Sequence, residues 1–388
     1  MALGAIGALF GGVAGCGSSS SSSSTASSST PASTTAATDT TAAATDKNKD
    51  VKIAVLSTGA VNNRSWANSW ADGAKKAAAE TGATITMVGN VETPDQYTQQ
   101  GASFASKGYN LIVFAHGAMN ESAIKLAKQF PDVQFVQAPY EFAKPADQAA
   151  EPVNLGHVDF KQEQGSFLSG ALAGMVTKSN KVAAVYAFPF PALTRQPEAF
   201  SLGARCVNPS VQFVQKATNS FTDSALARAA ASSLYSAGND VIFSAVDQAV
   251  QGVVAAANSA ATKPVYVVAS YSEQHDIGPD VVLTSVLYNL GGGLENIVKA
   301  YLADELGKNW YASYDLKDGV GELGTLANGL TLTAAQQKNM DDIKAAILSG
   351  DIKVPDGVTG TNPIGLKVGA GAAIDPASLG CTPAMQVK

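Results

Sequence analysis

The stretch that decides the fold is VKIAVLSTGAVNNRSWANSWADGAKKAAAETGATITMVG, residues 51 to 89. Its two ends, 51–57 and 83–89, are short apolar runs without strict polar alternation, which is typical of strands buried on both faces. Between them, residues 65–82 carry apolar side chains at helical spacing and close on a glycine. A strand, a helix and a second strand in this order predict a parallel pair of strands with a helix packed on one face.

The same pattern repeats along the chain in two successive series. In the first, apolar runs at 110–116 and 132–138 alternate with helical stretches at 94–108 and 119–131. The second series follows a helical stretch at 161–180 and has apolar runs at 180–187, 211–217, 240–246, 264–270 and 281–286, with helical stretches such as 224–239 and 248–261 between them. Two such series predict an α/β protein with two doubly wound parallel-sheet lobes, and ligands bind such sheets at the carboxyl ends of the strands.

The order of the segments gives an expected domain plan. Further helices at 291–307 and 333–355 suggest that the chain crosses back between the lobes, on hinge strands that let the lobes close as rigid bodies. We expect lobe 1 over 47–178, lobe 2 over 179–285, a return to lobe 1 over 286–310, and completion of lobe 2 with a C-terminal tail over 311–388. The cleft between two such lobes is the expected ligand site.

The N-terminal region has the composition of an export signal followed by a tether. The apolar leader ends in Val13, Ala14, Gly15 and Cys16, which resembles the lipobox of bacterial lipoproteins, in which the signal is cut before a cysteine that then carries lipid. The alternative is a free cysteine in an apolar leader. No charged residue precedes Asp39, so we expect the natural start upstream of Met1. Residues 17–46 are rich in Ser, Thr and Ala, and we expect a flexible coil there.

Composition limits the possible partners. The net charge of −6, with 46% hydrophobic and 15% charged residues, argues against a nucleic-acid partner, because phosphate binding needs a basic face. No apolar stretch after Cys16 is long enough to span a bilayer, so contact with the membrane is expected through the lipid anchor only. Cys206 and Cys381 remain as an even pair in an oxidising compartment, either bridged or as two free thiols.

The sequence lacks the usual signatures of catalysis. His116, His157 and His275 are scattered without metal-ligand spacing, so no metal is expected. There is no phosphate-binding loop and no nucleophile elbow, and the glycines at 291–293 open a helix without the rest of a dinucleotide fingerprint. We therefore expect neither an enzyme nor a cofactor.

Several side chains near the expected strand ends are candidates for the cleft. His116 and Gly117 follow the third strand, and the alternative for them is a turn with an incidental histidine. Phe188 and Phe190, in the FPFP stretch, are expected in a rigid loop at the cleft mouth or in a structural turn, since proline cannot continue a central strand. Two further candidates lie in lobe 2: Phe221 either covers a ligand or packs internally, and Asp247 either bonds a ligand or caps the next helix.

A set of stretches in the same order resembles the basic membrane protein family, which are solute-binding lipoproteins of ABC importers that include purine nucleoside receptors. The stretches are VNNRSWANSWADG (61–73), PDVQFV (131–136), GSFLSGALAGMVTKSNKVAAVYAFPFP (165–191), AFSLGARCVNP (199–209), NSFTD (219–223), GNDVIFSAVD (238–247) and GPDVVLTSVLYN (278–289). The resemblance covers about 51 to 320. It implies a type I periplasmic-binding fold that captures a nucleoside, nucleobase or related heterocycle and delivers it to an ABC permease.

The resemblance also implies roles for individual residues. Trp66 matches the position that stacks on the ligand ring, with anchoring of the first helix as the alternative, and Asn62, Asn63 and Ser65 lie in the loop that makes polar contacts. An aromatic face with nearby amides suits a flat heteroaromatic ring. Tyr271 and Ser272, and Tyr288 further on, stand near places where nucleoside-binding members carry an acidic residue and a lysine, which leaves a ligand without ribose open.

The expected protein is therefore a monomeric, lipid-anchored solute-binding protein on the extracytoplasmic face of a bacterial cell membrane. It would take a small-molecule ligand and pass it to an ABC permease. Two alternatives remain: a ligand-sensing lipoprotein that signals to a membrane partner, and an exported nucleoside-processing enzyme.

Overall fold

The computed structural model describes residues 48–139, 151–189, 191–308, 310–356 and 375–387. The expected signal and tether over 1–46, with Cys16, lie outside the described residues, and so does Phe190. All the elements described below belong to one compact unit, Thr41–Lys388.

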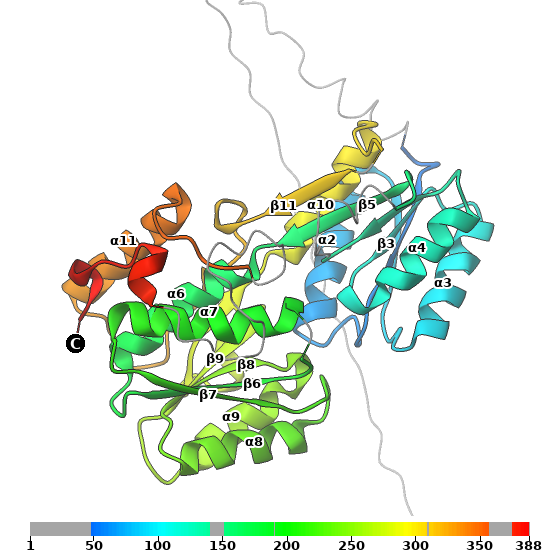
Figure 1. Ribbon diagram of the computed structural model, residues 1–388. Helices are drawn as coiled ribbons and strands as arrows, with labels where there is room; N and C mark the ends of the chain where they lie inside the picture. Colours follow the sequence, from blue (N-terminus) through cyan, green and yellow to red (C-terminus); the bar gives the residue numbers. More distant parts are fainter. Residues whose placement is uncertain (1–47, 140–150, 190, 309, 357–374, 388) are drawn as a thin grey trace, which may run out of the picture. The chain divides into compact units, whose positions relative to one another are not determined.

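The first sheet has six parallel strands in the order β11-β5-β4-β3-β1-β2. The strands are β1 (Lys52–Leu56), β2 (Thr84–Val88), β3 (Leu111–Phe114), β4 (Gln134–Gln137), β5 (Leu155–Phe160) and β11 (Tyr311–Tyr314). Helices α2 (Trp66–Thr81) and α10 (Leu290–Leu302) cover one face, and α3 (Pro94–Ser106) and α4 (Asn120–Gln129) cover the other (Figure 1).

Side chains of β1 alternate between these two faces. Ile53 and Val55 belong to the apolar cluster of α2 and α10, whereas Ala54 and Leu56 belong to the cluster of α3 and α4. Both faces are apolar because both are covered, which is why the strand lacks polar alternation in the sequence.

The second sheet has the order β12-β10-β9-β8-β6-β7. Its strands are β6 (Lys181–Tyr186), β7 (Gln212–Ala217), β8 (Val241–Ala245), β9 (Tyr266–Tyr271), β10 (Val282–Leu287) and the two-residue β12 (Glu322–Leu323). β12 is antiparallel to β10, and the other pairs are parallel. Helices α8 (Ser224–Ser236) and α9 (Val250–Ser259) cover one face, and α6 (Gln162–Val176) and α7 (Pro191–Val207) lie on the other. The expected doubly wound, two-lobed α/β fold is confirmed.

The chain passes between the two sheets three times. It crosses after β5, returns after β10, and crosses again between β11 and β12. The first crossing at Lys161 lies ahead of the expected boundary at 178, because α6 packs on α7 of the second lobe. The return to lobe 1 extends past the expected boundary at 310, because β11 adds to the edge of the first sheet beside β5.

Glycines allow two pairs of helices to approach closely. A Cβ on Gly73 of α2 would lie 2.4 Å from the Cα of Gly291 in α10, and a Cβ on Gly170 of α6 would lie 2.0 Å from the carbonyl oxygen of Phe200 in α7. The glycines at 291–293 therefore begin a packed helix that touches α2, which accounts for them without a nucleotide.

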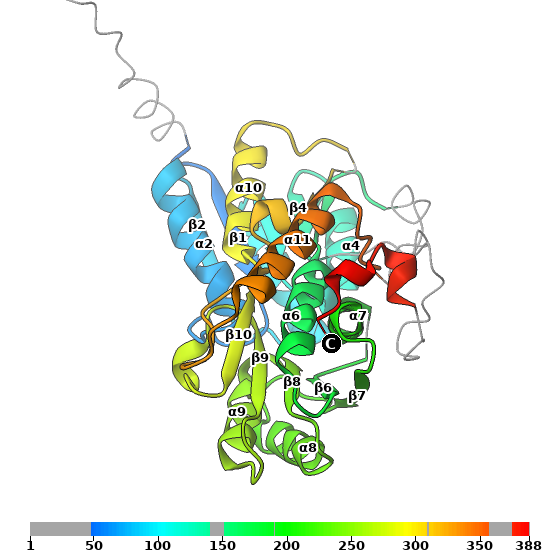
Figure 2. The same ribbon diagram turned by 90° about the vertical axis from the view of Figure 1, so that its left-hand side faces the viewer.

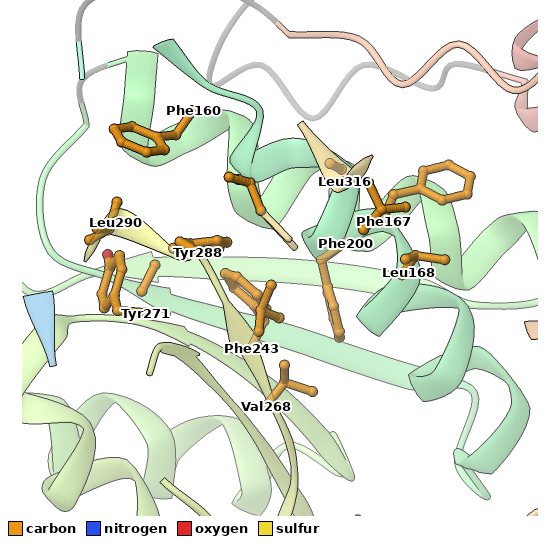
Figure 3. Packing of buried hydrophobic residues seen from close by; sticks show 14 of the residues in the cluster. Phe160, Phe167, Leu168, Phe200, Phe243, Val268, Tyr271, Tyr288, Leu290 and Leu316 are labelled. Carbon is orange, nitrogen blue, oxygen red and sulfur yellow. The ribbon is translucent and has the colours of Figure 1, made fainter. Parts of the chain in front are cut away.

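The apolar core continues across the crossings. Phe160 at the end of β5, Phe167 of α6 and Phe200 of α7 belong to the same buried cluster as Phe243, Val268, Tyr271 and Tyr288 of the second lobe (Figure 3). A buried guanidinium strengthens the same region: Arg195 of α7 donates to Asp159 (3.0 Å) and to the carbonyl of Phe160 (2.7 Å). These hydrogen bonds hold α7 against the end of β5, where the first crossing begins.

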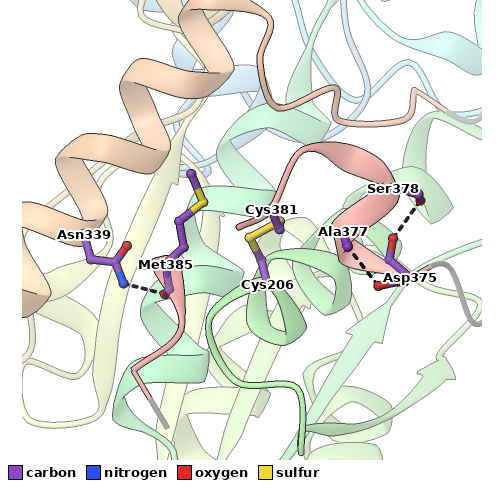
Figure 4. The surroundings of a disulfide bond; sticks show 7 residues. All are labelled: Cys206, Asn339, Asp375, Ala377, Ser378, Cys381 and Met385. Carbon is purple, nitrogen blue, oxygen red and sulfur yellow. Dashed lines mark hydrogen bonds between the residues drawn. A yellow bond between two sulfur atoms is a disulfide. The ribbon is translucent and has the colours of Figure 1, made fainter. Parts of the chain in front are cut away.

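The C-terminal segment is tied to the second lobe. Helix α11 (Ala334–Ser349) packs on α6, and the short helices η5 (Pro376–Leu379) and η6 (Pro383–Met385) follow it (Figure 2). Cys206 of α7 and Cys381 form a disulfide with Cα atoms 5.6 Å apart (Figure 4). Asn339 of α11 donates to the carbonyl of Met385 (2.6 Å), so the tail is also bonded to the helix beside it.

Candidate functional site

A cavity lies where the carboxyl ends of strands from both sheets meet. Its empty space, including the part open to solvent, is about 420 Å³. The lining residues come from both lobes and from the helices that follow the first crossing: Thr58, Trp66, His116, Gly117, Pro139, Gln162, Ala192, Leu193, Gln196, Phe221, Asp247 and Tyr271. Six of the residues that the sequence predicted at the cleft line this cavity: Trp66, His116, Gly117, Phe221, Asp247 and Tyr271. They are separated by up to 205 residues in the chain but meet here.

Aromatic rings from four segments of the chain form the walls. Trp66 is the first residue of α2, and its indole N–H donates to the carbonyl of Ala115 (2.7 Å), which fixes the ring at the end of β3. The rings of His116 and Tyr271 stand edge-on to Trp66, with centroids 6.0 and 5.5 Å away. Phe221 stands edge-on to His116 at 5.6 Å. The walls are therefore rigid and mostly apolar.

Asp247 is the acidic residue of the cavity. It begins the short helix η2 (Asp247–Ala249) after β8, and it is only 7% exposed. Its carboxylate does not cap that helix but accepts from the backbone N–H of Trp66 in the other lobe (3.3 Å). Burial raises the pKa of Asp247 to about 6, although the Ser65 hydroxyl and the Trp66 N–H act in the opposite direction.

His116 is held as a neutral ring. Its Nδ1 accepts from the backbone N–H of Ala118 (3.2 Å), at the start of the short helix η1 (Gly117–Met119). Burial lowers the pKa of His116 to about 4. The imidazole is therefore uncharged at neutral pH, with its proton on Nε2, and it adds no positive charge to the cavity.

Two amides of the cavity were missed by the sequence reasoning. Gln162 opens α6 and Gln196 lies in α7; the Gln196 amide donates to Gln162 (2.7 Å), and its oxygen accepts from the Tyr288 hydroxyl (3.0 Å). Both are buried polar side chains. A glutamine inside a predicted helix gives no signal of a ligand contact, and most of the helical stretch 161–180 was expected to belong to lobe 1.

Other candidates lie near the cavity without lining it. Asn62 is exposed. Asn63 uses its side-chain oxygen to accept from the N–H groups of Ser65 (2.9 Å) and Asn68 (3.2 Å), so it organises the start of α2. Ser65 is buried beside Asp247. Ser272 donates to the carbonyl of Arg64 (2.6 Å).

The phenylalanines of the FPFP stretch also lie outside the lining. The ring of Phe188 packs on Phe221 with centroids 5.1 Å apart, so it supports the cavity wall from behind. The expectation for Phe190 falls outside the described residues.

Contacts between the lobes close one side of the cavity. Arg64, in the loop before α2, forms an ion pair with Asp276 in η3 (His275–Ile277) of the second lobe. The bond from Ser272 to Arg64 and the bond from Trp66 to Asp247 join the same two lobes. The two lobes are thus in contact around the site.

The described residues contain no group of three or more His, Cys, Asp or Glu side chains placed to hold a metal ion. Among the same residues, no helix combines the length and the apolar character that a membrane span requires.

Two doubly wound lobes, three crossings and a cavity between the lobes define a binding protein of the type I periplasmic fold. Comparison with known proteins agrees. The family model described as ABC transporter substrate-binding protein PnrA-like matches residues 50–357. Basic membrane protein A2 of Borrelia garinii is 23% identical to this chain, over 78% of it and 88% of the relative. The chain belongs to this basic membrane protein family of ABC transporter substrate-binding proteins.

Solved structures show the same fold. An ABC transporter system solute-binding protein from Aeropyrum pernix K1 superposes with a TM-score of 0.66 at 19% identity, covering 79% of this chain and 94% of that one. A protein from Bacillus halodurans, described as a transcriptional activator of the comK gene, superposes with a TM-score of 0.64 at 21% identity, covering 77% and 98%. The family expected from the sequence is confirmed.

Proposed function

We propose that this solute-binding protein captures a nucleoside, a nucleobase or a similar heterocycle in the cavity between its lobes and delivers it to an ABC permease. The observation that carries the proposal is the lining of the cavity, where aromatic rings and the side chains of Gln162, Gln196 and Asp247 surround a narrow space. Aromatic walls stack on a flat ring, and amides and a carboxylate bond to its polar edge.

The proposal includes the position of the protein in the cell. A family of permease-dependent binding proteins works outside the cytoplasmic membrane, and the leader ending in Cys16 would hold this one there by a lipid, with residues 17–46 as a tether. A single chain supplies both sides of the cavity, which supports a monomer that closes around one ligand.

The test is a thermal-unfolding screen of the purified protein with nucleosides, nucleobases, flavins and sugars. A ligand at a hundredfold excess over its Kd stabilises the folded state by about 2.7 kcal/mol, which moves the midpoint by several degrees. We expect a shift with a heterocycle that is lost in Trp66→Ala. Exposed Val61→Ala, five residues earlier, is the matched control and should keep the shift. A shift with sugars alone would exclude the heterocycle.

A second function has one observation in its favour. The Bacillus halodurans structure with the same fold is described as a transcriptional activator, so a lipoprotein that senses a ligand and signals to a membrane partner is the alternative. Uptake of the labelled ligand by cells separates the two. Uptake that requires both this protein and a permease supports import, and binding without any effect on uptake supports sensing.

A further inference from the structure

The charge of the cavity is unbalanced. Among its described lining residues, Asp247 is the only side chain that carries a charge at neutral pH, since His116 is neutral there and the other polar groups are amides, hydroxyls and a phenol. No Lys or Arg is part of this lining. The described lining therefore offers one negative charge to whatever occupies the cavity.

Among the described residues, no cation is paired with this carboxylate. No described ion pair includes Asp247; its bonding groups are the Ser65 hydroxyl and the backbone N–H of Trp66, which are uncharged. The nearby Glu92, which accepts from the Gly59 N–H (2.7 Å), adds a second negative charge on the same side. Arg64, two residues before Trp66, pairs with Asp276 instead. A buried carboxylate without a cationic partner is unfavourable unless a ligand supplies one.

The walls around this carboxylate suit a positive charge. Trp66 and Tyr271 contact each other at 90°, and His116 is nearly perpendicular to both Trp66 and Phe221. All four of these aromatic residues line the cavity. Aromatic faces attract organic cations through the ring quadrupole, and the attraction is stronger where water is excluded.

We propose that the ligand of this cavity is an organic cation, a nitrogen heterocycle whose positive charge lies against Asp247 and between the aromatic walls. This inference rests on the proposed function and narrows its ligand class. A neutral ring can donate hydrogen bonds to the carboxylate but leaves its charge uncompensated, whereas a cationic ring compensates this charge and keeps its flat faces on Trp66 and Phe221.

The experiment uses pairs of probes that have nearly the same shape but differ in charge. Calorimetry at pH 7.5 compares 1-methylnicotinamide with nicotinamide, 1-methyladenosine with adenosine, and choline with 3,3-dimethylbutan-1-ol. The cation of at least one ring pair should bind about tenfold or more tightly than its neutral partner. Asp247→Asn, which keeps the acceptor for the Trp66 N–H, should remove this difference. Asp132→Asn, the same change of charge at an exposed site of lobe 1, should leave it intact.

The outcomes distinguish the inference from the proposed function. If neutral ring compounds bind as tightly as their cations, or if the preference persists in Asp247→Asn, the inference is wrong and the heterocycle site stands. Binding of neutral nucleosides or bases alone has the same meaning. If no heterocycle of either charge binds the folded protein, both the inference and the proposed function fail.

Discussion

Two residues of the cavity have a backbone conformation that side chains rarely adopt. Asp247, with φ of 48°, follows β8, and Tyr271, with φ of 81°, is the last residue of β9; both line the cavity. The left-handed region is costly for residues other than glycine, and such residues concentrate at functional sites. The backbone turns sharply at both positions, and this turn directs a carboxylate and a phenol toward the first lobe.

The raised pKa of Asp247 leads to a prediction about stability. Its pKa is about 6 in the folded protein and 3.8 ordinarily, so between these values the folded state binds more protons than the unfolded state. The stabilisation of the folded state by the protonated carboxyl group is therefore fully present below about pH 4 and is lost as the pH rises through about 6. The loss is at most about 3 kcal/mol. In Asp247→Asn this loss should be absent.

Urea titrations of both proteins without ligand, from pH 4 to pH 8, measure the effect. The free energy of unfolding of Asp247→Asn, relative to the natural protein, should increase by about 1 to 3 kcal/mol between pH 4 and pH 7 and then stay level. The other titrating groups are present in both proteins, so their effects cancel in the difference between the two free energies of unfolding. A difference that is independent of pH would show that the carboxylate is solvated in the free protein.

At the residue scale, cavity-lining residues that follow a strand were easier to predict from the sequence than those that lie on helices. His116 and Asp247 follow strand ends, and the rule for parallel sheets brings them together, whereas Trp66 was predicted from the resemblance to the family. Gln162 and Gln196 stand on helices after a crossing that the sequence did not locate. Asn63 and Ser272 have the chemistry of ligand contacts but bond to backbone groups, and that choice depends on local geometry.

At the element scale, nine strands could be predicted from apolar runs, and three could not. β5 reads LGHVDF, in which His157 and Asp159 interrupt the apolar pattern. Both are nevertheless buried: His157 lies 2.8 Å from Glu151, just ahead of the strand, and Asp159 pairs with Arg195 of α7. β11 is a four-residue edge strand, and β12 has two residues. The pairing of these strands depends on where the chain crosses between the sheets, and the local sequence pattern does not indicate these crossing points.

The disulfide gives a prediction for the C-terminal elements. The bond between Cys206 and Cys381 closes a loop with a sequence separation of 175 residues. A long loop restricts the unfolded chain strongly, so removal of the bond in Cys206→Ser/Cys381→Ser should lower the free energy of unfolding by about 2 to 5 kcal/mol. The thermal midpoint should fall by several degrees.

The control for this prediction is chemical reduction. Dithiothreitol should lower the midpoint of the natural protein to that of the double variant and leave the variant unchanged. If the midpoints of the oxidised protein and the double variant coincide, the hydrogen bonds from Asn339 to Met385 and from Val387 to Val207 are sufficient to hold the tail.

At the scale of the whole folded unit, three crossings join lobes that also touch across the cavity. The crossings resist twisting and leave hinge closure as the easy motion between two rigid sheets. The contacts opposite the hinge, from Arg64 to Asp276 and from Ser272 to the Arg64 carbonyl, exist only when the lobes are together. They therefore contribute to the balance between the open and closed arrangements.

The last prediction concerns that balance. Arg64 and Asp276 are each about 60% exposed, so their ion pair is weakened by water and salt, and its loss should shift the ratio of closed to open molecules only about two- to fivefold toward open. Single-molecule energy transfer between dyes on the two lobes of ligand-free protein measures this ratio. Asp276→Ala should show the shift, and high salt should reproduce it in the natural protein. Asp342→Ala removes an exposed ion pair within α11, away from the lobe contact, and should leave the ratio unchanged. An unchanged ratio in Asp276→Ala would mean that the buried contact between Trp66 and Asp247 dominates closure.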